Sequence, residues 1–582
     1  MVSRGPDDAG MWISPDGQTG LAHRRLSIID LSERGAQPMA LSRKNSADDD
    51  LRIVFNGEIY NYEHLRSRLE SQGRQFFSDS DTEVLLHLYD EKGEDMVEGL
   101  RGMYAFAILD PKREGVFLAR DPYGIKPLYF ADTGSSFYAA SQVQALRQIE
   151  GVDTKHDPAG HVGFFLWGHV PEPHTLYAGI QPLPAGHTLW VDTSGPRTPT
   201  SFGDLTDALR RGADDRTEAH NGDTTQNLLR GALLDTVEHH LVADVDVGLF
   251  LSAGLDSATL TALASEVTGR LRTITLGFEE FRGTPKDEVS GAERIAHHYG
   301  TNHETVWVTR QDFADAHDDL FAAMDQPSID GANSYFVSQA AAKAGLKVAI
   351  SGVGGDELFG GYPSFNEIPR LVSALAPIPG ISAFGHGFRT VAAPIVKQFT
   401  SPKYAGLLEY GNDYAGAYLL RRGLYMPWEL PEVLDPDLVL DGLSQLQPLI
   451  RLKATTREIV NDHLRVTALE STHYMRNQLL RDTDWASMAH SLEVRTPLVD
   501  WVLLQDVAPK IAEQGLTKQQ MAATPKLAIP DRIANRPKSG FSVPVREWLL
   551  TGRPEYSDSR GLRGWAQYVY RQHSDGMLVV NL

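Results

Sequence analysis

The pattern of apolar and polar positions divides the chain into a β-rich first part and a second part in which strands alternate with helices. From residue 1 to about 192, short apolar runs, such as those at 51–61, 104–110 and 187–192, are separated by Gly, Asp and Pro. Such runs are typical of a largely antiparallel sheet. Helical periodicity predicts helices over 63–70 and 82–92. Helices on such a sheet give an α+β arrangement.

The second part follows a polar stretch, residues 193–226, which is interpreted as an exposed connection. Beyond it the pattern predicts a helix over 228–241, a strand over 247–251, a helix over 258–268, and strands over 272–278 and 347–351. Strands joined by helices predict a parallel sheet. The predicted organisation is a first domain over 1–200, a linker over 201–225, a mainly helical second domain over 226–550, and a tail over 551–582 that is expected to pack loosely.

Composition narrows the possible classes of function. At 582 residues the chain is too long for one core. Its net charge of -21 argues against nonspecific nucleic-acid binding, and no apolar run approaches the ~20 residues of a membrane span. The chain contains no cysteine, and its first ten residues lack the apolar core of a signal peptide. We therefore expect a cytoplasmic protein that binds neither nucleic acid nor membranes.

Two loops that follow apolar strands are the candidates for chemistry. SAGLDS, residues 252–257, lies where parallel α/β sheets bind ligands, at a strand end that leads into a helix. Its Asp256 would repel a phosphate unless a cation lay between them, which indicates a magnesium ligand. SGVGGDE, residues 351–357, has the same pattern, with Asp356 as a second ligand. The alternatives are a capped strand–helix turn for the first loop and a Gly-rich helix cap for the second.

These loops, with SLEVRTPLVD (491–500) and RPKSGF (536–541), resemble the synthetase domain of the asparagine synthetase family, whose pyrophosphate loop usually reads SGGLDS. Five segments resemble the glutaminase domain of the same family: RGPDDAG (4–10), HRRLSIIDL (23–31), FNGEIYNY (55–62), SDSDTEVLL (78–86) and RDPYGIKPLY (120–129). The resemblance implies an incomplete α+β N-terminal nucleophile hydrolase-like sandwich. It also implies a following α/β adenine-nucleotide α-hydrolase-like domain, with a parallel sheet and many helices.

Members of this family activate a carboxylic acid with ATP, release pyrophosphate from an acyl-adenylate, and let an amine displace AMP. The resemblance thus implies ATP, Mg²⁺ and small-molecule substrates (a carboxylic acid, and glutamine or ammonia), and it allows a homodimer. It assigns pyrophosphate to Ser252, Gly254, Asp256 and Ser257, magnesium to Asp256 and Asp356, and adenosine to Leu251, Leu276, Ser351 and Gly352. Lys518 would stabilise charge in the intermediate, unless it is an exposed helix lysine.

The resemblance also assigns a glutamine site in the first domain. Arg25 would pair with the glutamine carboxylate, Asn56 and Gly57 would form the oxyanion hole, and Glu58 and Asp81 would bind the amine. In the family the first residue is a cysteine whose thiol attacks glutamine. This sequence begins Met-Val and has no cysteine, so as written we do not expect it to hydrolyse glutamine by that mechanism.

Two explanations account for a glutamine site without its nucleophile. Either the sequence starts at an internal methionine and the protein carries an upstream segment, or the domain is a structural remnant. We favour the first, because the loss of a strand would leave an unpaired edge. On this view the N-terminal sheet should show a gap with exposed apolar side chains.

Several other positions bear on the substrate. Val353 stands where the family loop often has an acidic residue, and residues 328–336 lack the Ser-Thr-Pro run of ordinary asparagine synthetases. The acceptor could therefore be aspartate or a specialised acid. Charged residues interleaved with apolar ones predict a partly buried network beside the pocket, with a solvated face as the alternative; they are Asp482, Asp484, Glu493, Arg495 and Asp500.

Three functions remain open at this stage. The first is an AMP-forming carbon–nitrogen ligase, and the second is an intramolecular cyclase similar to β-lactam synthetases or lasso-peptide cyclases. The third is a binding protein without activity. The glutamine-site residues argue against the cyclase, and the joint presence of Asp256, Asp356 and Lys518 argues against the binding protein. We therefore predict the ligase.

Overall fold

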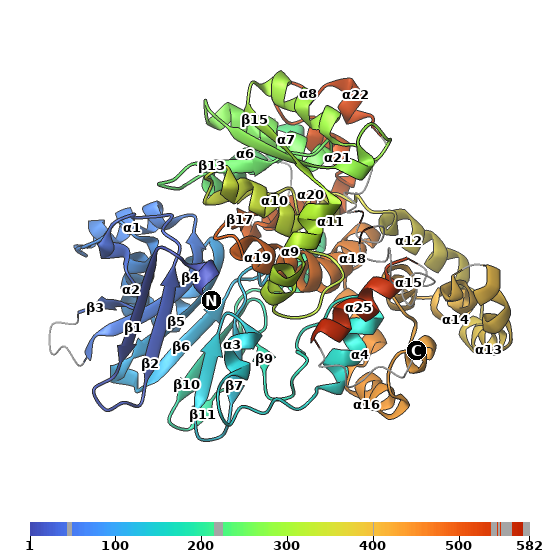
Figure 1. Ribbon diagram of the computed structural model, residues 1–582, viewed down its shortest axis with the longest axis horizontal. Coiled ribbons are helices and arrows are strands. Elements are labelled where there is room, and N and C mark those ends of the chain that lie inside the picture. The colour runs from blue at the N-terminus through green and yellow to red at the C-terminus, as the bar shows by residue number, and fades with distance from the viewer. Residues whose placement is uncertain are drawn as a thin grey trace.

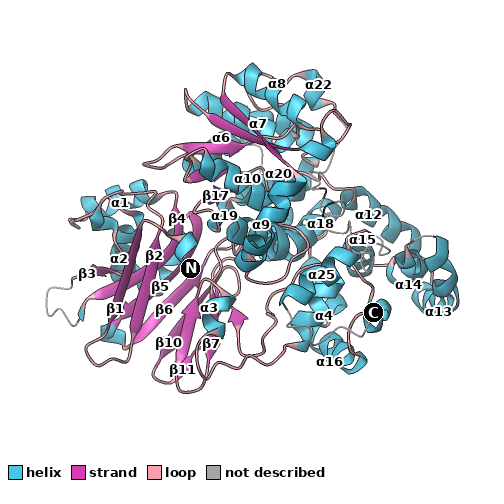
Figure 2. Ribbon diagram, viewed as in Figure 1, coloured by secondary structure: helices cyan, strands magenta, loops and turns pink. Residues whose placement is uncertain are grey.

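The computed structural model describes residues 1–42, 49–214, 225–399, 401–536, 544, 548 and 561–573. Figure 1 shows the main sheet of each half of the chain, set apart from the other in the molecule, with a group of helices that extends away from both. Coloured by secondary structure, the strands of the two sheets form two separate groups (Figure 2).

The main sheet of the first half has seven strands. Their order is β11-β10-β6-β5-β4-β3, with β12 also pairing with β10, and the pairs are antiparallel, as predicted. The bounds are β3 (Met39–Leu41), β4 (Leu51–Ile59), β5 (Gly102–Asp110), β6 (Gly115–Arg120), β10 (His187–Asp192), β11 (Gly195–Pro196) and β12 (Thr200–Ser201). Helices α1 (Tyr62–Ser71) and α2 (Asp81–Lys92) confirm both predicted helices, and α2 packs on the sheet.

Strands β1 (Asp8–Ile13) and β2 (Gly20–Arg25) form a separate two-stranded sheet. Met11 and Ile13 lie on the same face of β1, because side chains alternate along a strand, and they are 75% and 57% exposed. These apolar side chains are exposed as predicted, whereas the gap expected in the N-terminal sheet stays a prediction. A third small sheet pairs β7 (Tyr129–Asp132) with β8 (Phe137–Ala140) and β9 (Gln181–Pro182).

The second half contains a five-stranded parallel sheet in the order β15-β14-β13-β16-β17. Its strands are β13 (Val247–Phe250), β14 (Arg272–Phe278), β15 (Asn302–Val308), β16 (Val348–Ile350) and β17 (Glu493–Arg495). The predicted strand over 272–278 has the bounds of β14, and the predicted parallel pairing is confirmed. The ends of β13 and β16 are adjacent in this order, which brings together the two loops identified in the sequence.

Helices surround this sheet and form the rest of the second half. Those beside the sheet are α6 (Thr225–His240), α7 (Leu255–Val267), α8 (Val289–Tyr299), α9 (Arg310–Ala323), α10 (Ala332–Lys343), α11 (Gly355–Leu358), α19 (Arg481–Met488), α20 (Trp501–Gln514), α21 (Lys518–Ala522) and α22 (Asp531–Ala534). Further helices are α12 (Ser364–Leu375), α13 (Ile381–Phe399), α14 (Leu407–Tyr410), α15 (Tyr414–Arg422), α16 (Pro436–Leu446), α17 (Pro448–Thr456), α18 (Asp462–Leu469) and the π-helix η9 (Glu470–Leu480). Of these, α12, α13, α14 and α15 extend away from the sheets (Figure 1). Within the described ranges, no helix has the length and apolar character needed to cross a membrane.

Two predictions about the ends of the domains are wrong. The stretch read as an exposed connection includes helix α5 (Leu205–Asp214), whose Leu205 and Leu209 are buried against α20. Likewise, the tail does not pack loosely over its described part, because α25 (Arg563–His573) enters the main core of the second half. In both cases apolar side chains at helical spacing supply a buried face that polar neighbours obscure in the sequence.

Helix α25 is fixed by aromatic packing and hydrogen bonds. Its Tyr570 ring lies 4.7 Å from the ring of Phe165 on α4 (Pro158–Trp167), a helix of the first half. Trp565 is 2% exposed, and its indole N–H donates to the carbonyl oxygen of Ile329 at 3.0 Å. Figure 1 shows α4 and α25 beside one another.

Trp565→Ala should therefore lower the free energy of unfolding by about 3–5 kcal/mol, because a large cavity is left in the core. The measurement is urea unfolding followed by circular dichroism. Leu440→Ala is the control, since Leu440 is 67% exposed and its loss should change stability by no more than about 0.5 kcal/mol. Equal effects of the two substitutions would show that α25 does not belong to the core.

Candidate active site

The carboxyl ends of β13, β14 and β16 open into a cavity of about 840 Å³. Every position that the resemblance assigns to ATP, magnesium or the intermediate lines it: Leu251, Ser252, Gly254, Asp256, Ser257, Leu276, Ser351, Gly352, Asp356 and Lys518. Of the motif RPKSGF, Arg536 lines the cavity, and residues 537–541 lie outside the described residues.

The loop between β13 and α7 exposes the start of a helix to the cavity. Ser252 and Ser257 close the loop, with their hydroxyl oxygens 3.0 Å apart. Gly254 donates its N–H to the Ser252 hydroxyl at 3.1 Å, and no side chain caps α7 at this glycine. The first turn of α7 therefore presents N–H groups and the positive end of its dipole to the cavity. The tight turn of the alternative interpretation is therefore present and is closed by serine side chains, but it leaves the start of α7 without a side-chain cap.

The loop after β16 needs glycine at two positions. Gly354 has a φ of +100°, a conformation that side chains disfavour. Gly352 lies so close to the first loop that an added Cβ would be 3.1 Å from Cβ of Asp256. These glycines let the backbone of the second loop pass directly beside the carboxylate of the first.

Lys518 joins the two carboxylates. Its ammonium nitrogen lies 2.5 Å from Oδ2 of Asp256 and also forms an ion pair with Oδ1 of Asp356. The Thr517 side chain caps α21 and thereby fixes the start of the helix that carries Lys518. Burial opposes the charged form, but the two carboxylates outweigh it and raise the pKa of Lys518. Lys518 is 13% exposed, so it is not the exposed helix lysine of the alternative interpretation.

The five predicted glutamine-site residues, Arg25, Asn56, Gly57, Glu58 and Asp81, line a second, smaller cavity of about 70 Å³. The guanidinium of Arg25 donates to the carbonyl oxygens of Ser32, at 2.8 Å, and of Ile29, at 3.3 Å. Burial raises the pKa of Glu58, and it raises the pKa of Asp81 to about 6.

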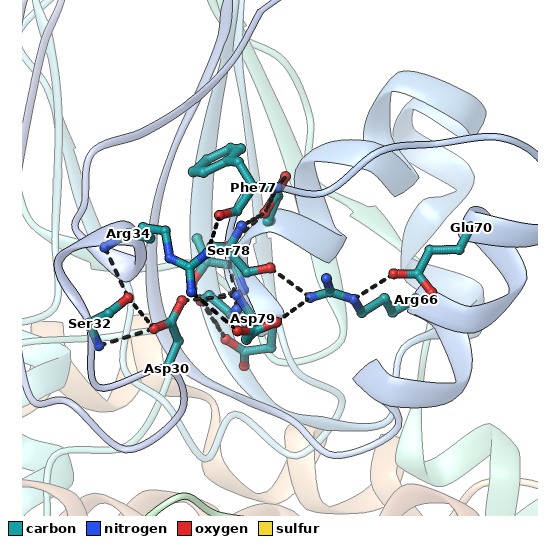
Figure 3. Close-up of polar contacts among 12 residues, drawn as sticks. Asp30, Ser32, Arg34, Arg66, Glu70, Phe77, Ser78 and Asp79 are labelled. Carbon is teal, nitrogen blue, oxygen red and sulfur yellow. Dashed lines mark hydrogen bonds and ion pairs between the residues drawn. The ribbon is translucent and has the colours of Figure 1, made fainter.

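Two arginines hold the loop that leads to Asp81 (Figure 3). Arg66 donates to the carbonyl oxygen of Ser78 at 2.7 Å, and Arg34 donates to that of Phe77 at 3.1 Å. The N–H of Asp79 donates to the carboxylate of Asp30 at 2.9 Å. The loop is thus tied to two neighbouring segments, which fixes the start of α2 and with it the position of Asp81.

Comparison with known proteins gives a family match for each half of the chain. The family model described as "Asparagine synthase" matches residues 228–571, and the one described as "Glutamine amidotransferase domain" matches residues 1–202. Asparagine synthetase [glutamine-hydrolyzing] 1 of Bacillus subtilis is 31% identical over 573 residues, which cover 96% of this chain and 84% of the relative. The chain belongs to the asparagine synthetase family.

Members of the asparagine synthetase family are ATP-dependent amide-forming ligases, and the chain is an enzyme of this class with an N-terminal nucleophile hydrolase-like domain followed by the α/β domain. A putative asparagine synthetase [glutamine-hydrolyzing] of Mycobacterium bovis is 32% identical over 578 residues, with 95% of this chain and 84% of that protein covered. Asparagine synthetase B [glutamine-hydrolyzing] of Escherichia coli is 32% identical over 389 residues, with 64% and 61% covered.

The predicted charged network is buried, as expected, and it connects the two domains of this synthetase. Arg495 is fully buried; it lies 3.4 Å from the carboxylate of Glu58 in the small cavity and 2.8 Å from that of Glu493. Lys126 of the first domain lies 3.8 Å from Glu493. Two further pairs cross the boundary, Arg4 with Asp484 at 2.6 Å and Arg101 with Asp500 at 2.9 Å.

Sequence reasoning did not predict the pairing of Glu357 with Tyr362, two side chains that line the nucleotide cavity. The hydroxyl of Tyr362 donates to the Glu357 carboxylate at 2.8 Å, and burial, with the nearby charge of Asp356, raises the pKa of Glu357 to about 7. The sequence offers one clue to this pair: Glu357 directly follows the predicted metal ligand Asp356, and Tyr362 comes five residues later in the same loop. The pairing itself depends on the fold.

Asp482 gives a pH-dependent stability prediction. Burial, with the charge of Asp330, raises the pKa of Asp482 to about 7. In the unfolded chain the pKa of an Asp side chain is about 3.9. The folded state therefore holds the proton to higher pH, and the wild type loses stability as the pH rises from about 4 to about 7. Asp482→Asn cannot ionise, so its stability relative to the wild type should improve by about 1.4 kcal/mol per pH unit across this window.

Urea unfolding at several pH values measures this effect. Asp318→Asn, at a fully exposed side chain, serves as the matched control and should follow the wild type. A constant difference between Asp482→Asn and the wild type at all pH values would show that Asp482 titrates normally.

Proposed function

We propose that this synthetase activates a carboxylic acid by transferring AMP to it from ATP, and that it then forms an amide with ammonia. The observation that carries the proposal is the convergence of Asp256, Asp356 and Lys518 at the start of α7. Two anionic substrates must be brought together in such a reaction, so the catalytic task is positioning and charge neutralisation.

In the first step, a carboxylate oxygen of the acid attacks the α-phosphorus of ATP, and the bond from this phosphorus to the oxygen that bridges to the β-phosphorus breaks. Pyrophosphate leaves with the electron pair. The N–H groups at the start of α7, with the hydroxyls of Ser252 and Ser257, would hold the pyrophosphate, and Lys518 would offset the charge that develops on it. Leu251, Leu276, Ser351 and Gly352 would hold the adenosine.

The residues present fit a magnesium ion. Mg²⁺ is usually bound by one or two carboxylates together with substrate phosphates, and Asp256 and Asp356 are two carboxylates held within reach of one ammonium. Among the described residues no group of three or more His, Asp or Glu could hold a metal by itself. Mg²⁺ held by both aspartates would neutralise phosphate charge when ATP is bound.

In the second step, ammonia attacks the acyl carbon, loses a proton, and AMP departs. Val353 lines the cavity where an acidic residue often stands in the family, so the proton must go elsewhere. Glu357 is suited to accept it, because a general base works best with a pKa near the working pH. The nitrogen that attacks is ammonia, supplied free or released from glutamine.

Exchange of labelled pyrophosphate into ATP, dependent on an added acid, tests the first step. Lys518→Met should lower the exchange rate by about 10²–10³-fold, because one stabilising charge is lost, and Lys518→Arg should retain part of it. Lys453→Met is the control, since Lys453 is 59% exposed. Circular dichroism checks that each variant is folded. Full exchange in folded Lys518→Met, or no exchange with any acid, would contradict the proposal.

A further inference from the structure

A third cavity, of about 450 Å³, adjoins the nucleotide cavity. Asp330 and Tyr474 line both cavities, so the two share a wall or opening at these side chains. Asp330 precedes α10, and Tyr474 lies in η9. We name the third cavity the distal chamber; its other lining residues include Trp167, His169, Lys403, Tyr418, Arg422 and His473.

The π-helix η9 forms one side of the distal chamber. It is a run of 11 residues, and it contributes His473, Tyr474 and Gln478 to the lining. π-Helical turns are rare, and they frequently occur at functional sites. The unusual helix is thus located where the two cavities meet.

The charges around the distal chamber favour an anionic ligand. Burial lowers the pKa values of His169 and His473 to about 3, so both are neutral. Arg422 and Lys403 carry positive charge, and Asp330 is the acid in the lining. The burial of Asp330 raises its pKa.

The two cations differ in their partners. Arg422 is held by Glu470 at 2.8 Å and lies over the rings of Tyr474 and Tyr362, at 3.8 and 4.5 Å. Lys403 has no hydrogen bond or ion pair with any residue that the structure describes. Its surroundings, first by burial and then by the charge of Arg563, lower its pKa to about 8. An anionic group of a ligand would relieve this cost.

The remaining wall is aromatic and apolar. The rings of Trp167 and Tyr418 lie 6.2 Å apart, and Ile329 and Leu424 also contribute to it. A volume of about 450 Å³ is within the range of roughly 300–1,000 Å³ that holds drug-sized ligands. Such a space greatly exceeds what the side chain of a four-carbon dicarboxylic acid needs.

We propose that the distal chamber binds the far end of the acid that is activated in the nucleotide cavity, and that this acid carries a second anionic group on an aromatic body. Its reacting carboxylate would lie beside Lys518, the body would pass Asp330 and Tyr474, and the second anionic group would pair with Lys403. This inference rests on the proposed function, and it names the class of acid.

The test uses three probes in pyrophosphate exchange: L-aspartate, 3-phenylpropanoate, and 4-(2-carboxyethyl)benzoate, which has two carboxylates on an aromatic body. Of the three probes, 4-(2-carboxyethyl)benzoate should support exchange with the highest kcat/KM. Lys403→Met should raise its KM by about tenfold or more, as expected for a lost charge pair. The same substitution should leave kcat for 4-(2-carboxyethyl)benzoate and the KM of the singly charged 3-phenylpropanoate nearly unchanged. Lys403→Arg keeps the positive charge and should restore the affinity for 4-(2-carboxyethyl)benzoate. Lys453→Met again serves as the control.

Calorimetric titration of each probe into the protein supplies a readout independent of catalysis. Tight binding of 4-(2-carboxyethyl)benzoate that is lost in Lys403→Met supports the distal chamber as a ligand site. If this binding is seen but no acid supports exchange, the proposed function fails and the assignment of the distal chamber stands. A preference for L-aspartate that Lys403→Met does not alter would overturn the chamber. So would equal binding of 4-(2-carboxyethyl)benzoate by the wild type and Lys403→Met, or no binding of it by the wild type.

Discussion

The active site depends on one electrostatic constraint: two carboxylates at neighbouring strand ends repel each other unless a cation lies between them. The parallel order of β13 and β16 places Asp256 and Asp356 side by side, and Lys518 forms an ion pair with both from a helix far along the chain. The same contact fixes α21 over the end of the sheet. The glycines of the second loop leave no room for larger side chains. The close approach of the two loops, and with it the spacing of the two carboxylates, therefore depends on these glycines.

A similar principle governs the boundary between the domains. Arg495 contacts Glu58 of the small cavity through its side chain, and its carbonyl oxygen accepts the N–H of Ser351, the first residue of the second loop. Buried charges of this kind are costly when a partner is removed. The arrangement therefore holds the two cavities in a fixed relation, although they lie in different domains.

The sequence allowed the prediction of features that depend on local pattern. The bounds of β14, the parallel order and the meeting of Asp256 with Asp356 follow from apolar runs and strand-end loops. The buried faces of α5 and α25 were not recognised, since only tertiary contacts make residues such as Leu209 and Trp565 core residues. The distal chamber could not be predicted from the sequence either, because its residues come from distant segments and share no sequence motif; examples are Trp167, Lys403 and Tyr474.

The most direct test of the central claim is the affinity of the protein for ATP, measured by titration calorimetry with Mg²⁺ and with a chelator. If Asp256 and Asp356 hold the metal against the phosphates, the wild type should bind ATP at least about tenfold more tightly with Mg²⁺, a gain of about 1.4 kcal/mol. The double variant Asp256→Asn/Asp356→Asn should bind ATP equally with and without Mg²⁺. A double variant that keeps the full gain would contradict the account.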